Sequence, residues 1–213
     1  MPAHGAITSL DVAPRDGDSR EIKVNSRKVA TLLESDVARL GLHLDMPMTE
    51  SMAQRIAYHH ECRLAWRAAI QRLEKSARSE RDIREGLQKR GHEDDVVEQV
   101  ISILAGSGLL DDVRLAASAA ESMARRSPAS SAFIEARLVR HGISSEEAEK
   151  AAVEAAGDPV DAATELAAKS LKSLGSCAPE ARVRRIYGRL ARRGFDADVI
   201  TEAMRRINLE IPE

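Results

Sequence analysis

Apolar residues recur along this chain in a helical pattern that returns at a nearly constant interval. The phrase Ile-x-x-x-Leu-x-x-(Arg/His)-Gly occurs three times, beginning at Ile83, Ile134 and Ile186, at intervals of 134 − 83 = 51 and 186 − 134 = 52 residues. Isoleucine and leucine four positions apart lie on one face of a helix, and glycine readily adopts the left-handed conformation that closes many helices. A regular interval of this size indicates tandem structural units rather than one closed core.

Two further helical patterns accompany each phrase. Apolar residues stand six, nine, ten and thirteen positions after each glycine: Val97, Val100, Ile101 and Leu104, then Ala148, Ala151, Ala152 and Ala155, then Ile200, Ala203, Met204 and Ile207. This spacing is typical of the buried face of a second helix, reduced to alanine in the middle copy. Helical stretches also precede the phrases, at residues 64–77, 112–126 and 161–174. We therefore predict three tandem three-helix repeats, 61–109, 110–157 and 158–213, in an elongated, curved array.

The first sixty residues have the shorter period of β-strands. An apolar run that includes Ile7, Leu10 and Val12 ends at Pro14, residues 15–18 have the composition of a turn, and Ile22 and Val24 alternate with charged residues. Asn25 and Ser26 suit a second turn before a third strand at 29–32. A short helix follows Ser35, and a long helical stretch toward Tyr58 begins at Pro47 and Thr49. We predict a mainly α protein with a small antiparallel β element in residues 1–60. Such an element is marginal alone and should dock on something else, which the sequence does not identify.

Composition constrains the class of protein without selecting a function. Aromatic residues make up 2% of the 213 residues, so the packing should be aliphatic, while the formal net charge of −2 neither favours nor excludes nucleic acid. No apolar run approaches the roughly 20 residues of a membrane helix, and the N-terminus lacks the pattern of a signal peptide. Cys62 and Cys177 do not suggest a disulfide framework. We expect a monomeric cytoplasmic protein that does not contact a membrane.

Three short motifs resemble reactive sites, and each has a simpler interpretation. His59 and Cys62 could share a metal, but a closed zinc site needs four ligands and no partner motif exists. The Gly106-Ser107-Gly108 segment lacks the rest of a phosphate loop and suits a helix-ending turn. Asp111 and Asp112 suit the cap of the following helix. With no nucleophile in a recognisable context, we expect no enzyme activity, no catalytic residue, no cofactor and no metal.

One charge pattern is more informative. Residues 181–195 contain no acidic residue, and six arginines occur there: Arg182, Arg184, Arg185, Arg189, Arg192 and Arg193. On a helix, four of them form one stripe beside an apolar face: Arg182, Arg185, Arg189 and Arg192. This stripe could be an ordinary solvated face, or it could contact phosphates or acidic side chains of a partner.

Five segments carry a resemblance to a known family: ITSLDV at 7–12, AWRAAI at 65–70, RSERDIREGLQKRGH at 78–92, GLLDD at 108–112 and RLARRGF at 189–195. In their order and spacing the chain resembles the RecX family, bacterial regulators of the RecA recombinase, over nearly its whole length. It departs from the family where His92, Leu115 and Ile143 replace residues that are usually aromatic. The alanine-rich second repeat is also lengthened by residues 127–131.

The resemblance implies a negative regulator that binds the RecA filament on single-stranded DNA. Members limit filament growth and persistence, and thereby lower ATPase, strand-exchange and coprotease activities. We expect partner contacts at Arg182, Arg185, Arg189, Arg192 and Arg193, with Arg78 and Arg90 as secondary candidates, although no family motif fixes these residues; direct DNA contact should be weak. Two alternatives stay open. One is a module that competes for DNA, which the near-neutral charge argues against; the other is a helical-repeat scaffold for an unrelated partner.

Overall fold

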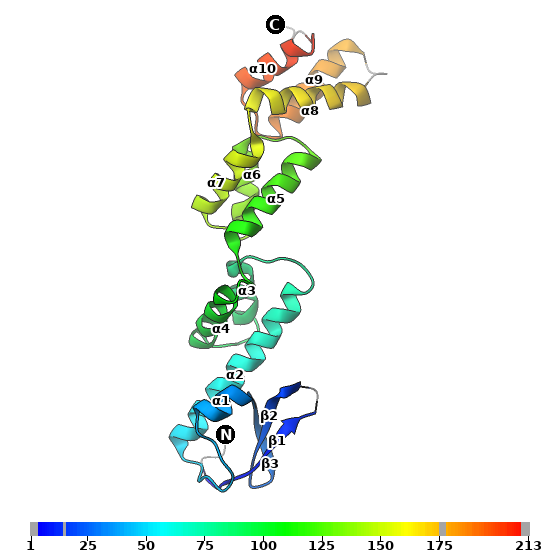
Figure 1. Ribbon diagram of the computed structural model, residues 1–213. Helices are drawn as coiled ribbons and strands as arrows, with labels where there is room; N and C mark the ends of the chain where they lie inside the picture. The colour runs from blue at the N-terminus through cyan, green and yellow to red at the C-terminus, as the bar shows by residue number, and fades with distance from the viewer. Residues whose placement is uncertain (1–3, 15, 175–177, 210–213) are drawn as a thin grey trace. The chain divides into compact units, whose positions relative to one another are not determined.

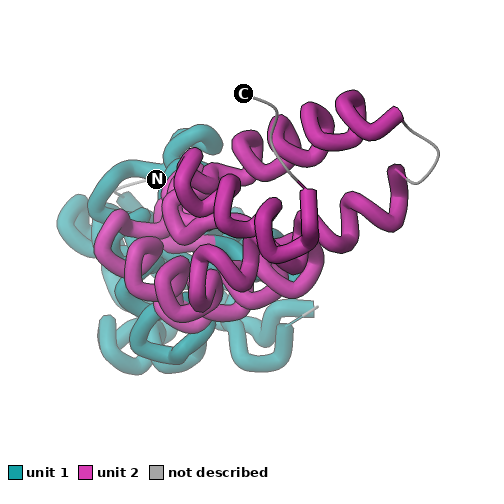
Figure 2. The backbone as a smooth tube through the Cα atoms, turned by 90° about the horizontal axis from the view of Figure 1, so that it is seen from above, with its two compact units in different colours: residues 1–78, 83–110 teal, residues 79–82, 111–213 magenta. Residues whose placement is uncertain are grey.

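The protein consists of three strands followed, in the part of the chain that the structure describes, by ten helices (Figure 1). The computed structural model describes residues 4–14, 16–174 and 178–209. These form two compact units: unit 1 comprises residues 1–78 and 83–110, and unit 2 comprises residues 79–82 and 111–213 (Figure 2). Within the described residues, no helix has both the length and the apolar character needed to cross a membrane.

The N-terminal strands form the predicted antiparallel element. Strands β1 (Ile7–Ala13), β2 (Asp16–Val24) and β3 (Arg27–Leu33) pair in that order in one sheet. Asn25 and Ser26 have φ values of 49° and 64°, as expected for the two-residue turn whose twist matches an antiparallel hairpin. The predicted turn at 15–18 is wrong in part, because Asp16 pairs with Ala13 and already belongs to β2. Arg15 lies outside the described residues.

The sheet docks on the first long helix, as its small size requires. After the short helix α1 (Glu34–Arg39), helix α2 (Glu50–Leu73) runs unbroken for 24 residues. The sheet, α1, the following loop and the first half of α2 share one apolar core: Ile7, Ile22, Val24, Ala30, Leu32, Leu40, Leu42, Met48, Ala53 and Ile56. The helical stretches that the sequence indicated separately after Thr49 and at 64–77 are therefore one helix, which ends at Leu73 and contains the predicted repeat limit at 60/61.

The second half of α2 supplies the first helix of a repeat. It packs with helices α3 (Glu80–Gln88) and α4 (Asp94–Gly106) around a second core. The predicted apolar positions Ile83, Leu87, Val97, Val100 and Leu104 are all fully buried there. Gly108, with a φ of 70°, follows the end of α4, so the Gly106-Ser107-Gly108 segment is a helix-ending turn as predicted.

Unit 2 contains two further three-helix repeats, each with its own core. Helices α5 (Asp112–Arg126), α6 (Ser131–Arg140) and α7 (Ser145–Ala156) enclose a core rich in alanine. Helices α8 (Pro159–Ser173), α9 (Pro179–Ala191) and α10 (Ala197–Arg206) enclose the next. The predicted mainly α fold with tandem three-helix repeats is confirmed, while the elongated, curved shape stays a prediction.

The repeated glycine ends its helix in the same way in all three copies. Gly91, Gly142 and Gly194 have φ values of 85°, 94° and 80°. In each copy the N–H of the next residue donates to the carbonyl of the repeated leucine, at 3.4, 3.2 and 3.4 Å respectively. This is the hydrogen bond that closes a helix through a left-handed residue, so the predicted role of the glycine is confirmed.

Gly142 and Gly194 also lie against Ser79 and Ser130, each of which begins another helix; the sequence did not reveal these contacts. Ser79 and Ser130 each accept a backbone N–H in the first turn of α3 and α6, from Asp82 and Phe133 respectively, both at 3.2 Å. Ser79 Oγ donates to the carbonyl of His141 at 2.9 Å, and Ser130 N–H donates to that of Arg193 at 3.0 Å.

The contacts leave no room for a side chain on either glycine. A Cβ built on Gly194 would lie 2.5 Å from Ser130 Oγ, and one on Gly142 would collide with Ser79 Oγ. A Cβ on Gly91 would meet nothing within 4 Å. A serine that begins one helix therefore fits against a glycine that ends another, twice in unit 2.

Alanine substitutions should separate the two roles. Gly91→Ala should reduce the free energy of unfolding by about 1 kcal/mol, because alanine is strained at positive φ. Gly194→Ala should cost about 2–4 kcal/mol, because it adds a steric conflict with Ser130. Both values are checked by denaturant unfolding followed by circular dichroism.

A double-mutant cycle supplies the control. Ser130→Ala alone should cost about 1 kcal/mol through the lost helix cap, and the double variant should cost less than the sum of the two changes. Equal costs at Gly91 and Gly194 would contradict the close-contact interpretation.

The adjacent aspartates of the predicted cap have different partners. Asp111 caps α5 as expected, accepting from the N–H of Arg114 at 2.8 Å. Asp112 instead accepts from the N–H of Glu80, at 3.0 Å for Oδ1 and 3.3 Å for Oδ2, and so serves the first turn of α3. Burial raises the pKa of the Asp112 carboxyl, and the negative charges of Glu147, Glu80 and Asp111 add to that effect.

Removing the charge of Asp112 while keeping its acceptor should therefore stabilise the protein at neutral pH. A carboxyl whose pKa is raised by folding contributes stability below its unfolded pKa of 3.8, and that contribution is lost as the pH rises through the folded value. Asp112→Asn should have a higher melting temperature than the wild type at pH 7, and the gain should shrink toward pH 4. Asp112→Ala, which removes the hydrogen-bond acceptor, should be less stable than Asp112→Asn both at pH 7 and at pH 4. A gain for Asp112→Asn that does not depend on pH would contradict this account.

Candidate functional site

Helix α9 separates its apolar residues from its arginines. Val183, Ile186 and Leu190 are buried in the core shared with α8 and α10. The other sides of the helix carry the predicted arginines: Arg184, Arg185, Arg189 and Arg192 are exposed, and Arg182 and Arg193 are half-buried. Residues 181–195 contain no carboxylate, so this stretch of unit 2 contributes positive charge only.

The arginines of this surface differ in what they contact. Arg182 and Arg185 already interact with other residues of the protein. Arg193 lies over the ring of Phe133 in α6, with its Cζ 5.2 Å from the ring centroid, and Arg137 lies over the same ring at 5.9 Å. Phe133 is thus contacted by guanidinium groups from two different repeats.

Arg189 adds a third positive charge near Arg193 and Arg137. Burial lowers the pKa of Arg193, and the positive charges of Arg189 and Arg137 lower it further. Within the described part of the chain, no carboxylate lies at ion-pair distance from any of the three. We call Arg137, Arg189 and Arg193 the arginine cluster.

The backbone holds the cluster together. The hydrogen bond from Ser130 N–H to the carbonyl of Arg193 joins the start of α6 to the end of α9, and Gly194 allows the close approach. Cation–π contact with Phe133 orients two of the guanidinium groups. Like charges repel one another, and an anion that bound between them would relieve this repulsion. Guanidinium groups bind phosphate and carboxylate in a bidentate manner, so the cluster suits either anionic group.

The sequence predicted part of this site and missed part of it. Arg189 and Arg193 were among the predicted residues, but Arg137 and Phe133 were not, since α6 also contains Glu135 and gave no run of basic residues. Arg137 lies four positions after Phe133, so both residues are on one face of α6; this was the available signal. Arg78 and Arg90 are exposed in unit 1 and lie outside the cluster, which unit 2 forms by itself.

The residues first considered for a metal have other contacts. His59 Nδ1 lies 3.5 Å from Asp36 Oδ1 and 3.2 Å from a guanidinium nitrogen of Arg39. Burial raises the pKa of the Cys62 thiol and lowers that of His59. Among the described residues, no three His, Cys, Asp or Glu side chains are grouped as a metal site would require. Cys177 lies outside those residues.

If the arginine cluster binds a partner rather than stabilising the fold, removing one charge should not destabilise the protein. Arg189→Gln should change the free energy of unfolding by no more than about 0.5 kcal/mol and should raise it at low salt, because repulsion is relieved. The matched control is Arg206→Gln, which removes ion pairs to Asp161 and Glu202 and should not raise stability. Thermal unfolding at low and high salt measures both. A marked loss of stability in Arg189→Gln would show a structural role instead.

Comparisons with known proteins agree with this architecture. Residues 65–104 match the family model described as "RecX, first three-helix domain", and residues 157–204 match "RecX, third three-helix domain". A crystal structure of "regulatory protein RecX" superposes with a TM-score of 0.76 at 22% identity, covering 94% of this chain and 99% of that one. RecX from Lactobacillus salivarius superposes with a TM-score of 0.59 at 21% identity, covering 70% and 97% of the two chains.

Similar sequences point to the same family. Regulatory protein RecX of Geobacillus thermodenitrificans is 27% identical over 201 residues, which cover 92% of this chain and 75% of that protein. The protein of the same name from Amycolatopsis mediterranei is 30% identical over 63% of this chain and 79% of its own length. The regulatory protein RecX of Xanthomonas campestris pv. campestris (strain B100) is 33% identical over 64% of this chain and 83% of its own length. With its repeated three-helix units and these relatives, the chain belongs to the RecX family.

Proposed function

We propose that this protein is a negative regulator of a RecA-type recombinase, which it binds on single-stranded DNA through the arginine cluster and the exposed arginines beside it. The observation that carries the proposal is the gathering of three arginines without a carboxylate, in a chain of the RecX family. Relatives named regulatory proteins support a regulatory role. Binding to the filament would limit its growth and persistence, and with them its ATPase and strand-exchange activities.

A recombinase filament offers two kinds of anion to such a surface. Its DNA carries phosphates, and its protein surface carries carboxylates, and either could meet a guanidinium group bidentately. Exposed charge pairs are screened by salt, so binding should weaken as ionic strength rises. The exposed Arg189 and Arg192 are the residues we expect to contact the partner first, and Arg137 completes the surface from α6.

A second candidate function is direct competition for DNA. The arginine cluster favours it, because several phosphate contacts would give strongly salt-dependent affinity. The overall formal charge of −2 disfavours it, since the rest of the molecule does not attract a polyanion. A helical-repeat scaffold for an unrelated partner would fit the same fold.

Charge reversal should remove the regulatory effect. In a test of single-stranded-DNA-dependent ATP hydrolysis by the cognate RecA, the wild type should inhibit at well below equimolar amounts. The triple variant Arg137→Glu, Arg189→Glu, Arg192→Glu should inhibit at least about tenfold less well, because the loss of about 1.4 kcal/mol in binding is a factor of ten. The matched control reverses three exposed arginines of α5, namely Arg114, Arg125 and Arg126, and should inhibit like the wild type.

Other outcomes distinguish the alternatives. Equal inhibition by both triple variants and the wild type would keep the function and exclude the arginine surface. A loss of inhibition that follows a matching loss of DNA affinity without RecA would favour competition for DNA. Absence of any effect on RecA from folded protein would leave a scaffold for another partner.

A further inference from the structure

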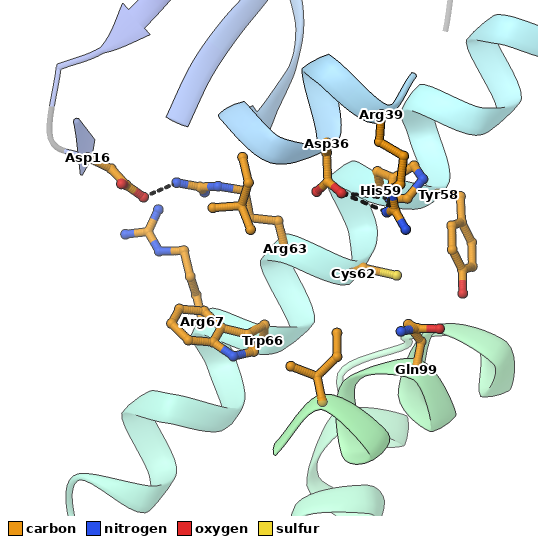
Figure 3. Close-up of a pocket in the computed structure, with 12 residues that line it drawn as sticks. Asp16, Asp36, Arg39, Tyr58, His59, Cys62, Arg63, Trp66, Arg67 and Gln99 are labelled. Atoms are coloured by element: carbon orange, nitrogen blue, oxygen red, sulfur yellow. Dashed lines mark hydrogen bonds and ion pairs between the residues drawn. The ribbon is translucent and has the colours of Figure 1, made fainter. Parts of the chain in front are cut away.

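Unit 1 contains a pocket that the proposed function does not use (Figure 3). It lies between the end of β3 with α1, the middle of α2, and α4, and its volume is about 280 Å³. Its walls are mainly carbon atoms, and Figure 3 shows Trp66 and Cys62 of α2 and Gln99 of α4 around it. All of its lining residues belong to unit 1.

Three large apolar side chains of this pocket are exposed. Leu33, Trp66 and Ile103 are 42%, 39% and 46% exposed, and they come from β3, α2 and α4 respectively. Most large apolar side chains of unit 1 are buried in its two cores. Exposed apolar residues that converge on a hollow from three separate elements are typical of a surface that another molecule covers.

The charged groups on the inner wall of the pocket are paired with one another. Arg63, only 7% exposed, donates from Nε to Ser19 Oγ at 3.0 Å and forms an ion pair with Asp16, so this side of the pocket is held by charge-assisted hydrogen bonds. Burial raises the pKa of Tyr58 to about 12 and also raises that of Cys62. The phenol and thiol therefore stay neutral at pH 7, as an apolar occupant needs.

The charges at the rim favour an acidic occupant. Both carboxylates of the pocket have a cationic partner: Asp16 pairs with Arg63, and Asp36 pairs with Arg39 at 2.7 Å. Arg67 is exposed and, among the described residues, no carboxylate pairs with it. An occupant with a negative charge beside its apolar part would complement this arginine.

The size and lining of the pocket limit its occupant. A volume of about 280 Å³ is about nine times the roughly 30 Å³ share of one water molecule and lies at the lower end of the range of about 300–1,000 Å³ for small-molecule pockets. It suits one or two side chains. A phosphate backbone would gain from Arg67 but nothing from the three apolar side chains.

We propose that this pocket binds an acidic peptide segment of a partner protein, which inserts one large apolar side chain between Leu33, Trp66 and Ile103 and places a neighbouring carboxylate against Arg67. The site belongs to unit 1 and shares no residue with the arginine cluster. If the pocket did not bind such a peptide, the proposed function would be unaffected. If the proposed function were wrong, peptide binding by the pocket would be unaffected.

Trp66 is the only tryptophan of the chain and so reports on the pocket directly. The probe is a capped synthetic peptide, Gly-Ser-Glu-Glu-Leu-Glu-Glu-Ser-Gly, titrated at low salt while Trp66 fluorescence is recorded. We expect a saturable change with a Kd below about 1 mM, which corresponds to about −4.1 kcal/mol. Peptides with alanine in place of leucine, or lysine in place of the glutamates, should bind at least about tenfold more weakly.

Two variants test the residues. Arg67→Glu should weaken binding at least about tenfold, whereas the matched change Lys75→Glu, at an exposed lysine after the end of α2, should leave it unchanged. In a Cys177→Ser background, saturating peptide should slow the alkylation of Cys62, which lines the pocket; this readout does not depend on substituting a pocket residue.

Three results would overturn the proposal. One is the absence of a saturable fluorescence change up to several millimolar peptide, with the protein shown to be folded. Another is equal binding of the leucine and alanine peptides. The third is a saturable change with oligo(dT), or with rising protein concentration alone, at lower concentrations than with the peptide, which would assign the pocket to nucleic acid or to a second copy of the chain.

Discussion

The contact between a helix-starting serine and a helix-ending glycine is the constraint on which unit 2 depends. At Ser79 with Gly142 and at Ser130 with Gly194, the same two chemical needs are met together. The first turn of one helix needs an acceptor for its free N–H groups, and the last turn of another needs donors for its free carbonyls. Because both ends are satisfied across the contact, polar backbone groups can approach closely without an uncompensated loss of hydration. The absence of a Cβ on the glycine makes the approach sterically feasible.

That contact also explains why a basic surface forms where it does. Arg193 immediately precedes Gly194, and Phe133 lies in the first turn of the helix that Ser130 caps, so joining the two backbones brings the arginine over the ring. Arg137 lies one turn after Phe133 in α6 and contacts the same ring, so arginines of the second and third repeats meet there. The arginine cluster is therefore a consequence of how two helix ends are joined. Its mutual repulsion is balanced by the packing and hydrogen bonds of the contact.

In unit 1, the long helix α2 stabilises both the sheet and the first repeat. The sheet has too few strands to be stable alone, and α2 serves both the sheet and the first repeat by burying different residues along its length. Between those two cores the helix carries polar and aromatic side chains, which face α1 and α4 around the pocket. The buried Arg63, with Ser19 and Asp16, ties the strand to the helix at this point. A surface that joins two cores is a natural place for a preformed hollow, since neither core extends far enough to fill it.

By itself, the sequence determined the features that depend on consecutive residues. The period of the phrase, the apolar face of each helix, the helix-closing glycines, the two-residue turn at Asn25 and Ser26 and the cap at Asp111 are local properties, and the structure has all of them. Only the tertiary structure decided the features that join distant residues. Arg137 and Arg193 are 193 − 137 = 56 positions apart, and no local pattern places them over one ring. No local pattern predicted the contacts of Ser79 with Gly142 and of Ser130 with Gly194, or the hydrogen bond that Glu80 N–H donates to Asp112. No local pattern predicted the pocket between β3, α1, α2 and α4 either. Hydrophobic periodicity determines which face of a helix is buried, but the side chains that meet across separate helices are fixed only when the backbones have packed.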